Sequence, residues 1–350
     1  MILHCLRRLG RRPLALALAI GFAQLLSNPD NAAANPLRLG ILGDSISAGD
    51  GSAVGSYPNW VTQLTASGAF TVGPDGNQAG DGDVASDVFN TQLPVIQGQI
   101  QSGQLDYTVL AVGANDLGNA ALTYVATGDL AGTLQLFFNT VLPTIENTIT
   151  TIAATSPPVH QIVMNIPDPT SSPEVQGLIA QYGITPAQLA PAIAALQTAN
   201  DQLDAFALAR GIPVIDLYTA TQTILTHPPL VLAGVTYNDL FAPDAFHPGP
   251  ALQGLIADAV INAANRAYGA GLAPISEEQI VANLGGTPLI AGPTYYNLDH
   301  LVLLPVPEPS TMVLAVLGAM AWFALPAIAR RRSPQSSGRG ATGTPRPRTC

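Results

Sequence analysis

Residues 37–45 read LRLGILGDS, and this stretch decides how the fold can be predicted. The apolar run over 37–42 predicts a strand, and Gly43, Asp44 and Ser45 end that strand in a sharp turn. Near-continuous apolar character is typical of a strand that is buried on both faces, as in a parallel sheet. The small polar residues that follow are suited to opening a helix. The stretch therefore predicts the strand–turn–helix unit of an α/β fold.

Three further apolar runs along the chain predict more strands of the same kind. They are YTVLAV at 107–112, HQIVMNI at 160–166 and IPVIDL at 212–217. Helical patterns lie between the strands, at 57–67, 86–101, 129–154, 186–209 and 250–268. The 129–154 pattern is expected to be interrupted or kinked at Pro143. This alternation predicts an α/β fold, a doubly wound parallel sheet sandwiched by helices, with ligands bound beyond the carboxyl ends of the strands.

The N-terminal segment, 1–34, has the three-part pattern of a secretory signal peptide. Its first twelve residues are basic, residues 14–26 form an apolar run, and Ala32–Ala34 provide a small-x-small cleavage site. An apolar run of this length is too short to span a bilayer comfortably. The segment predicts export and removal by signal peptidase.

The C-terminal segment has a second tripartite pattern. Val306–Ser310 reads VPEPS, residues 311–329 are mostly apolar, and Arg330–Arg332 form a basic cluster. As a helix, the apolar run rises by about 28 Å, which is enough for a hydrocarbon core, and the Arg cluster should stay cytoplasmic. Residues 306–332 resemble a PEP-CTERM sorting signal, which implies an exosortase-type processing protease. A plain membrane anchor is the alternative, and 333–350 is expected to be a disordered tail.

Charge and cysteine content limit the partners of the segment between the two ends. Residues 35–307 contain three Arg, 17 Asp and four Glu, and so carry a formal charge of −18. Such a surface repels phosphate backbones, and nucleic acid is therefore excluded as a partner. The two cysteines, Cys5 and Cys350, lie in the terminal segments. The rest of the chain can therefore form neither a disulfide nor a thiolate metal site.

Polar residues capable of chemistry follow several of the predicted strands. Ser45 follows the first strand, and Asn115 lies in the GAND turn after YTVLAV. Asp244 and His247 are three residues apart in DLFAPDAFHPG, and Gly82 lies in NQAGDGDVASD. An acid near a histidine can fix its tautomer, and an amide or backbone N–H can donate to an oxyanion. Each motif alone could equally be an ordinary turn.

Taken in chain order, these four motifs resemble the four blocks of the GDSL (SGNH) hydrolase family. The resemblance covers about residues 37–268 and implies a flavodoxin-like hydrolase domain at 35–270, followed by a C-terminal extension or linker at 271–305. It implies a Ser45 nucleophile, a His247 base oriented by Asp244, and oxyanion donors from Gly82 and Asn115. The first block departs from the family name, because Ile46 stands where Leu is common.

The function implied is hydrolysis of carboxylic esters by an exported serine esterase. No metal or cofactor is required by this chemistry. The chain is expected to be anchored transiently in the inner membrane and then delivered to the cell surface or the extracellular matrix. Esters of lipids, carbohydrates and small molecules all remain open as substrates. The alternative is a non-catalytic surface or matrix protein that uses the same fold for binding.

Overall fold

The computed structural model describes residues 36–48, 58–226, 231–232, 235–236, 240–276, 279–280, 282 and 301–305. The predicted signal peptide, sorting signal and tail therefore lie outside the described residues. Within the described part of the chain, no helix is both long and apolar enough to cross a membrane.

The main sheet confirms the doubly wound arrangement. Its strand order is β2-β1-β3-β4-β5-β8, and the first five strands are parallel. The strands are β1 (Leu37–Gly43), β2 (Phe70–Thr71), β3 (Tyr107–Ala111), β4 (His160–Met164), β5 (Val214–Ile215) and β8 (Val302–Leu303). Chain order reverses at β1, so the crevice beyond β1 and β3 is the position where doubly wound folds bind ligands. The sheet is not wholly parallel, because β8 runs antiparallel to β5.

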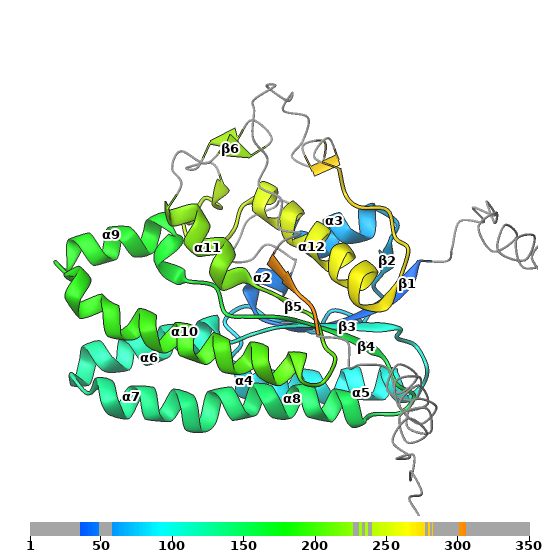
Figure 1. Ribbon diagram of the computed structural model, residues 1–350, viewed down its shortest axis with the longest axis horizontal. Helices are drawn as coiled ribbons and strands as arrows, with labels where there is room; N and C mark the ends of the chain where they lie inside the picture. The colour runs from blue at the N-terminus through cyan, green and yellow to red at the C-terminus, as the bar shows by residue number, and fades with distance from the viewer. Residues whose placement is uncertain are drawn as a thin grey trace, which may run out of the picture. The chain divides into compact units, whose positions relative to one another are not determined.

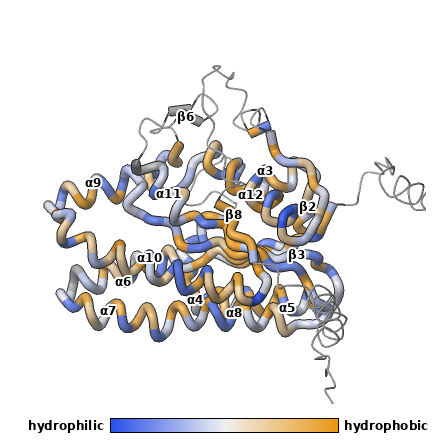
Figure 2. The backbone as a smooth tube through the Cα atoms, viewed as in Figure 1, coloured by the Kyte–Doolittle hydropathy of each residue, from blue (hydrophilic) through white to orange (hydrophobic). Residues whose placement is uncertain are grey.

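Helices cover both faces of the sheet (Figure 1), and the buried side chains on the two faces form separate cores. On one face, α3 (Trp60–Ala66) and α12 (Pro250–Tyr268) pack on alternate β1 side chains such as Leu39 and Ile41. On the other face, Leu42 packs with the helices α5 (Leu93–Gln101), α8 (Leu142–Ala154) and α10 (Pro186–Leu208). Figure 2 shows the apolar strands in the middle of these layers. Burial on both faces is the physical reason for the continuous apolar runs.

Two of the predicted helices each contain a π-helical turn. The 86–101 pattern forms α4 (Ala85–Asp87), the π turn η1 (Val88–Gln92) and then α5. The 129–154 pattern forms α7 (Leu130–Leu136), the π turn η2 (Phe137–Val141) and then α8. The expected interruption at Pro143 is confirmed, because η2 ends just before the first turn of α8, which contains this proline. Proline has no N–H to continue the preceding hydrogen-bond ladder.

Several elements lie outside the predicted set or differ from it. The helices α6 (Ala114–Thr127), α9 (Pro173–Gln181) and α11 (Leu217–Thr226) were not individually predicted. The strand expected at 212–217 is shorter, because Leu217 already begins α11. The helix predicted after the first strand is the short α2 (Ser45–Ala48). The remaining elements are the 3₁₀ turn η3 (Pro169–Ser171), β6 (Val231–Leu232) and β7 (Val235–Thr236).

The described part of the predicted extension, 271–305, packs against the domain. Ile275, Ile280, Leu301 and Val302 are buried in the core beside α12. The carbonyl oxygen of Leu301 accepts the N–H of Asp216 at 2.9 Å, which places β8 beside β5. Burial of these apolar side chains is what holds the segment on the sheet.

Candidate active site

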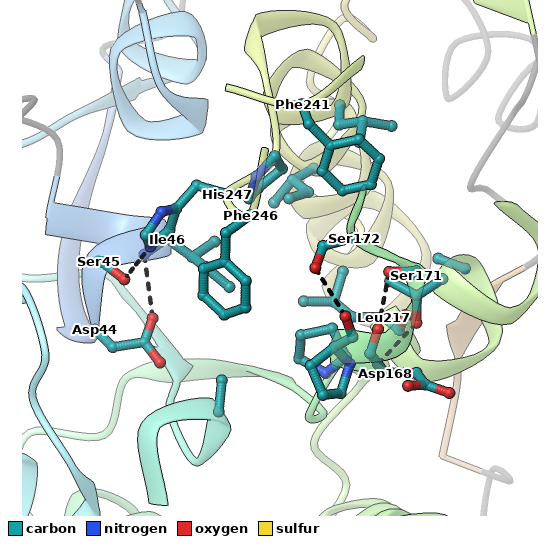
Figure 3. Close-up of a pocket in the computed structure, with 18 of the residues that line it drawn as sticks. Asp44, Ser45, Ile46, Asp168, Ser171, Ser172, Leu217, Phe241, Phe246 and His247 are labelled. Carbon is teal, nitrogen blue, oxygen red and sulfur yellow. Dashed lines mark hydrogen bonds between the residues drawn. The ribbon is translucent and has the colours of Figure 1, made fainter. Parts of the chain in front are cut away.

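Ser45 is held at the carboxyl end of β1. Adjacent strands approach closely there, since a Cβ on Gly43 would lie 2.5 Å from the carbonyl oxygen of Ala111. The short helix α2 then begins at Ser45 itself, whose side chain is almost buried. Ser45 Oγ lies 2.8 Å from His247 Nε2, within hydrogen-bond distance (Figure 3). The predicted nucleophile and the predicted base therefore meet across a sequence separation of 202 residues.

His247 is oriented by Asp244 from within the same loop. Asp244 Oδ2 lies 2.5 Å from His247 Nδ1. The other oxygen, Asp244 Oδ1, accepts the N–H groups of Phe246 and His247, both at 3.0 Å. Ala245 adopts a left-handed conformation with φ of 58°, which is uncommon for a residue other than glycine. This turn lets one carboxylate hold both the ring and the backbone of the histidine.

The base of the loop is closed by backbone pairing. Ala242 N–H donates to the carbonyl oxygen of His247 at 2.8 Å, and Gly249 N–H donates to that of Leu240 at 2.6 Å. A Cβ on Gly249 would lie 2.6 Å from the Leu240 oxygen, so this approach requires glycine. The loop is thereby held together before α12 begins at Pro250.

The Asp244 carboxyl has a depressed pKa. Partial burial acts to raise the pKa, but the hydrogen bonds from the His247 ring and from the N–H groups of Phe246 and His247 act in the other direction and prevail. Asp244 is therefore ionised at neutral pH, and its negative charge faces the imidazole Nδ1–H. A carboxylate in this position stabilises a positive charge on the ring.

Asn115 lies at the start of α6, directly after β3. Because β3 neighbours β1 in the sheet, with Ala111 opposite Gly43, Asn115 and Ser45 follow adjacent strand ends. Asn115 lines the same pocket as Ser45 and His247. Its amide nitrogen donates to the carbonyl oxygen of Asp83 at 3.0 Å. Gly82, which has a φ of 78°, precedes Asp83 but is not among the residues that line the pocket.

Gln92 is a site-supporting residue that the sequence analysis missed. Its Oε1 accepts the N–H of Gly43 at 2.8 Å, and its Nε2 donates to the Gly43 carbonyl oxygen at 2.8 Å and to Asp83 Oδ2 at 2.7 Å. Gln92 is almost fully buried. It thus ties the end of β1 to the loop that contains Gly82. The available signal was its four-residue spacing from Val88 and Ile96, which places a polar side chain on the apolar face of the helix.

Asp44, the neighbour of Ser45, carries a second perturbed carboxyl. Burial raises its pKa to about 7, and the nearby carboxylates of Asp116 and Asp83 add to the rise, against hydrogen bonding from the Ile46 N–H. The pKa of Asp116 is also raised, chiefly by burial. At the end of β1, the Ser45 hydroxyl therefore follows directly in sequence on a carboxyl whose pKa is about 7.

A cavity of about 110 Å³ opens beside Ser45 and His247 (Figure 3). Its walls come from α2, the start of α6, the 167–172 segment, α11, the loop 241–248 that contains His247, and α12. Most of the side chains that line it are apolar, among them Leu117, Leu217, Phe241, Phe246, Leu252 and Ile256. The sequence analysis did not predict this pocket, because its walls come from segments that are distant in sequence.

Comparison with known families identifies two regions of the chain. Residues 41–255 match the model of the GDSL-like lipase/acylhydrolase family. Residues 305–332 match the PEP-CTERM protein-sorting motif. No curated protein sequence matches the chain significantly.

Solved structures with a similar arrangement include three hydrolases of low sequence identity. A lipase from a goat rumen metagenome is 15% identical, covering 71% of this chain and 97% of its own, with a TM-score of 0.40. A catalytic mutant of an acetylxylan esterase from Geobacillus stearothermophilus is 14% identical, covering 65% and 93%, with a TM-score of 0.40. Phospholipase A1 from Streptomyces albidoflavus NA297 is 19% identical, covering 61% and 93%, with a TM-score of 0.42.

Proposed function

Because the chain belongs to the GDSL-like lipase/acylhydrolase family and is a hydrolase of ester bonds, we propose that Ser45, His247 and Asp244 carry out this hydrolysis. Ser45 Oγ attacks the ester carbonyl carbon while His247 Nε2 takes the hydroxyl proton. The tetrahedral intermediate then collapses, and the alcohol leaves with the proton from His247. Asp244 holds the ring in the required tautomer and stabilises the imidazolium that forms.

The second half of the reaction releases the acyl group. A water molecule attacks the acyl–Ser45 ester as His247 takes a proton from it, and the proton is returned to Ser45 Oγ when the acid departs. The product is a carboxylic acid, and the serine and the histidine return to their starting states.

The oxyanion is held by donors from three segments in this proposal. They are the N–H groups of Ser45 and Gly82 and the side-chain amide of Asn115. An amide nitrogen has two hydrogens, so the bond from Asn115 to Asp83 leaves the second hydrogen for the oxyanion. That bond also supports the role of Gly82, since Gly82 is covalently joined to Asp83.

The observation that carries the proposal is the pair of hydrogen bonds that links Ser45 to His247 and His247 to Asp244. A fluorophosphonate probe should label Ser45, and the protein should hydrolyse p-nitrophenyl acetate. The Ser45→Ala variant should lose both the labelling and the hydrolysis while keeping the wild-type melting temperature. Equal labelling of the wild type and of Ser45→Ala would mean that another residue is the nucleophile. If the protein hydrolyses no ester at all, the alternative of a non-catalytic binding protein is favoured.

The sorting motif supports export and membrane-associated processing, and the finer route is part of the proposal. Signal peptidase removes 1–34, the apolar segment 311–329 holds the chain in the inner membrane, and an exosortase-type protease then releases it. The mature protein spans roughly residues 35–308 and resides at the cell surface or in the extracellular matrix. Intact-mass measurement of the exported protein tests this route, and retention of 311–350 would indicate a plain membrane anchor.

A further inference from the structure

The pocket beside Ser45 limits which part of an ester the protein can hold. One end lies at Ser45 and His247, and the other lies at Asp168, Ser171 and Leu217 (Figure 3). Phe246 lies between the two ends in this view, with its ring edge-on to the His247 ring at a centroid distance of 5.0 Å. Apolar side chains of α11 and α12 complete the walls.

The polar side chains at the far end already have partners inside the protein. The Asp168 carboxylate accepts the N–H of Thr170 at 2.8 Å and is also bonded to the side-chain amide of Gln222. Ser171 Oγ donates to the carbonyl oxygen of Asp168 at 2.8 Å. Ser172 Oγ donates to the carbonyl oxygen of Pro169 at 2.9 Å and caps α9. None of these groups therefore needs a polar ligand atom, which is unlike a wall built to bind sugar hydroxyls.

The far end of the pocket is closed. Asp168 is fully buried, and Ser171 and Ser172 are almost so. The volume of about 110 Å³ can be compared with that of an apolar cavity of ~150 Å³ that binds benzene, a ring of six carbons. The pocket therefore has room for a chain of about four to six carbons.

We propose, resting on the nucleophilic role given to Ser45 above, that this pocket binds an unbranched acyl chain of about four to six carbons. The chemistry favours the acyl part of the ester over the alcohol part. The alcohol must leave before water attacks, and a closed pocket would retain it. The acyl group stays attached to Ser45 during that exchange, so a closed pocket holds it without blocking the reaction. The preferred substrates are then short-chain acyl esters of this length and not acetylated polysaccharides.

The expected dependence on chain length follows from apolar burial. Each methylene that enters the pocket should raise kcat/KM about fourfold, because burial of one CH₂ contributes about 0.8 kcal/mol. Four methylenes separate acetate from hexanoate, so the gain should be on the order of 10²-fold. Beyond the closed end, longer chains should gain nothing further or lose activity.

Two isomeric esters give the sharpest test with the purified full chain. Ethyl hexanoate and hexyl acetate have the same atoms, but they place the six-carbon chain on the acyl and the alcohol side, respectively. Ethyl hexanoate should be hydrolysed at least ten times faster at equal, subsaturating concentration. Equal rates, or faster hydrolysis of hexyl acetate, would overturn the assignment of the pocket to the acyl chain.

Filling the pocket gives a second, independent test. Ala220 lines the pocket on α11 and is buried, so Ala220→Leu should lower the hexanoate-to-acetate ratio of kcat/KM at least tenfold. Ala194→Leu, at an exposed position on α10, is the matched control and should leave that ratio unchanged. Leu217→Ala should shift the preferred chain to greater length. A ratio that is the same in all folded variants contradicts the proposal.

The outcomes separate this inference from the proposed function. If Ser45 is labelled by a small fluorophosphonate and acetate is hydrolysed, but kcat/KM does not rise towards hexanoate, only the acyl-chain assignment fails. If no ester is hydrolysed and Ser45 is not labelled, the proposed function fails first.

Discussion

The two ends of the parallel strands differ sharply in how their charged groups are stabilised. At the amino end, Asp106 pairs with Arg38 at 2.6 Å, and this pair lowers the pKa of the Asp106 carboxyl. At the carboxyl end of the same strand β1, burial raises the pKa of Asp44 to about 7. Asp204, which accepts weak hydrogen bonds from Asn165 after β4, likewise has a pKa raised to about 7 by burial and by Asp216.

The amino end also carries an aromatic stack. The rings of His160 and Tyr268 stack at 4.1 Å between centroids, and Tyr107 contacts both. Tyr268 further donates its hydroxyl to the carbonyl oxygen of Gln161. These contacts pack the amino end of the strands. The carboxyl end instead carries carboxyls with raised pKa values, and one of them, Asp44, lines the pocket, which is typical of functional sites.

The largest expected effect is the loss of turnover when Asp244, the carboxylate that orients His247 at the carboxyl end of the strands, is replaced. Asp244→Asn should reduce kcat by about 10⁴-fold, because the amide no longer holds the productive tautomer of His247. Asp106→Asn, at the opposite end of the strands, is the matched control and should leave kcat unchanged. Steady-state kinetics on p-nitrophenyl esters measures both. A similar kcat for both variants would remove the functional distinction between the two ends.

The next effect concerns the oxyanion. Asn115→Ala should lower kcat by about 10²–10³-fold, or ~3–4 kcal/mol, since the amide bond strengthens as charge develops in the transition state. KM should change less, because the ground-state carbonyl carries less charge. Asn119→Ala, at an exposed position on the same helix α6, serves as the control. A near-wild-type kcat in a folded Asn115→Ala protein would remove Asn115 from the site.

A smaller effect is expected in the pH dependence of stability. The raised pKa values mean that the folded state binds protons at Asp44 and Asp204 more tightly than the unfolded state, in which an Asp carboxyl has its ordinary value of 3.8. Stability should therefore fall as the pH rises from about 4 through 7, and by about 2–3 kcal/mol per carboxyl between pH 5 and pH 8. Urea unfolding at these two pH values measures the difference.

A matched pair of variants assigns the pH effect to one end of the strands. Asp204→Asn should flatten the slope between pH 5 and pH 8, because a titrating group is removed. Asp106→Asn should leave this slope unchanged. Because the pKa of Asp106 is lowered in the folded state, its carboxylate contributes to stability throughout pH 5–8, and this contribution is lost only at more acidic pH. If both variants keep the wild-type slope, Asp204 is not a source of the pH dependence.

The smallest effect is expected from the exposed ion pair. Arg38→Ala should lower the melting temperature by no more than about 3 °C, because exposed pairs contribute little to stability. The difference from wild type should shrink further in 1 M salt, where exposed charges are screened. Melting curves at low and high salt test this, and a large, salt-independent loss would mean that the pair has a structural role deeper than its exposure indicates.

The features predicted from sequence are those that local patterns determine. The strands β1, β3 and β4 follow from apolar runs that are buried on both faces. Asp244 and His247 lie in one short loop, so their spacing alone places the acid near the base. Ser45 could be placed because it follows directly on β1.

What escaped prediction depends on contacts between distant segments. β8 pairs with the edge of β5, a partner that the local sequence does not specify, and α11 begins at Leu217, inside the expected fourth strand. The pocket needs the 167–172 segment, α11 and α12 together, so no single stretch of sequence reveals it. Gln92 carries a weak signal, a polar side chain on an apolar face, but its partners cannot be read from that position.

The placement of β8 also determines when the sheet can be finished during synthesis. Val302 is made 87 residues after Ile215, the last residue of β5, which at 5–20 residues per second is roughly 4–17 s later. Throughout that time the N–H and C=O groups on the outer side of β5 lack their final neighbour. The strand that covers this edge is followed within a few residues by the sorting motif. The sheet is therefore completed just as the sorting signal is translated.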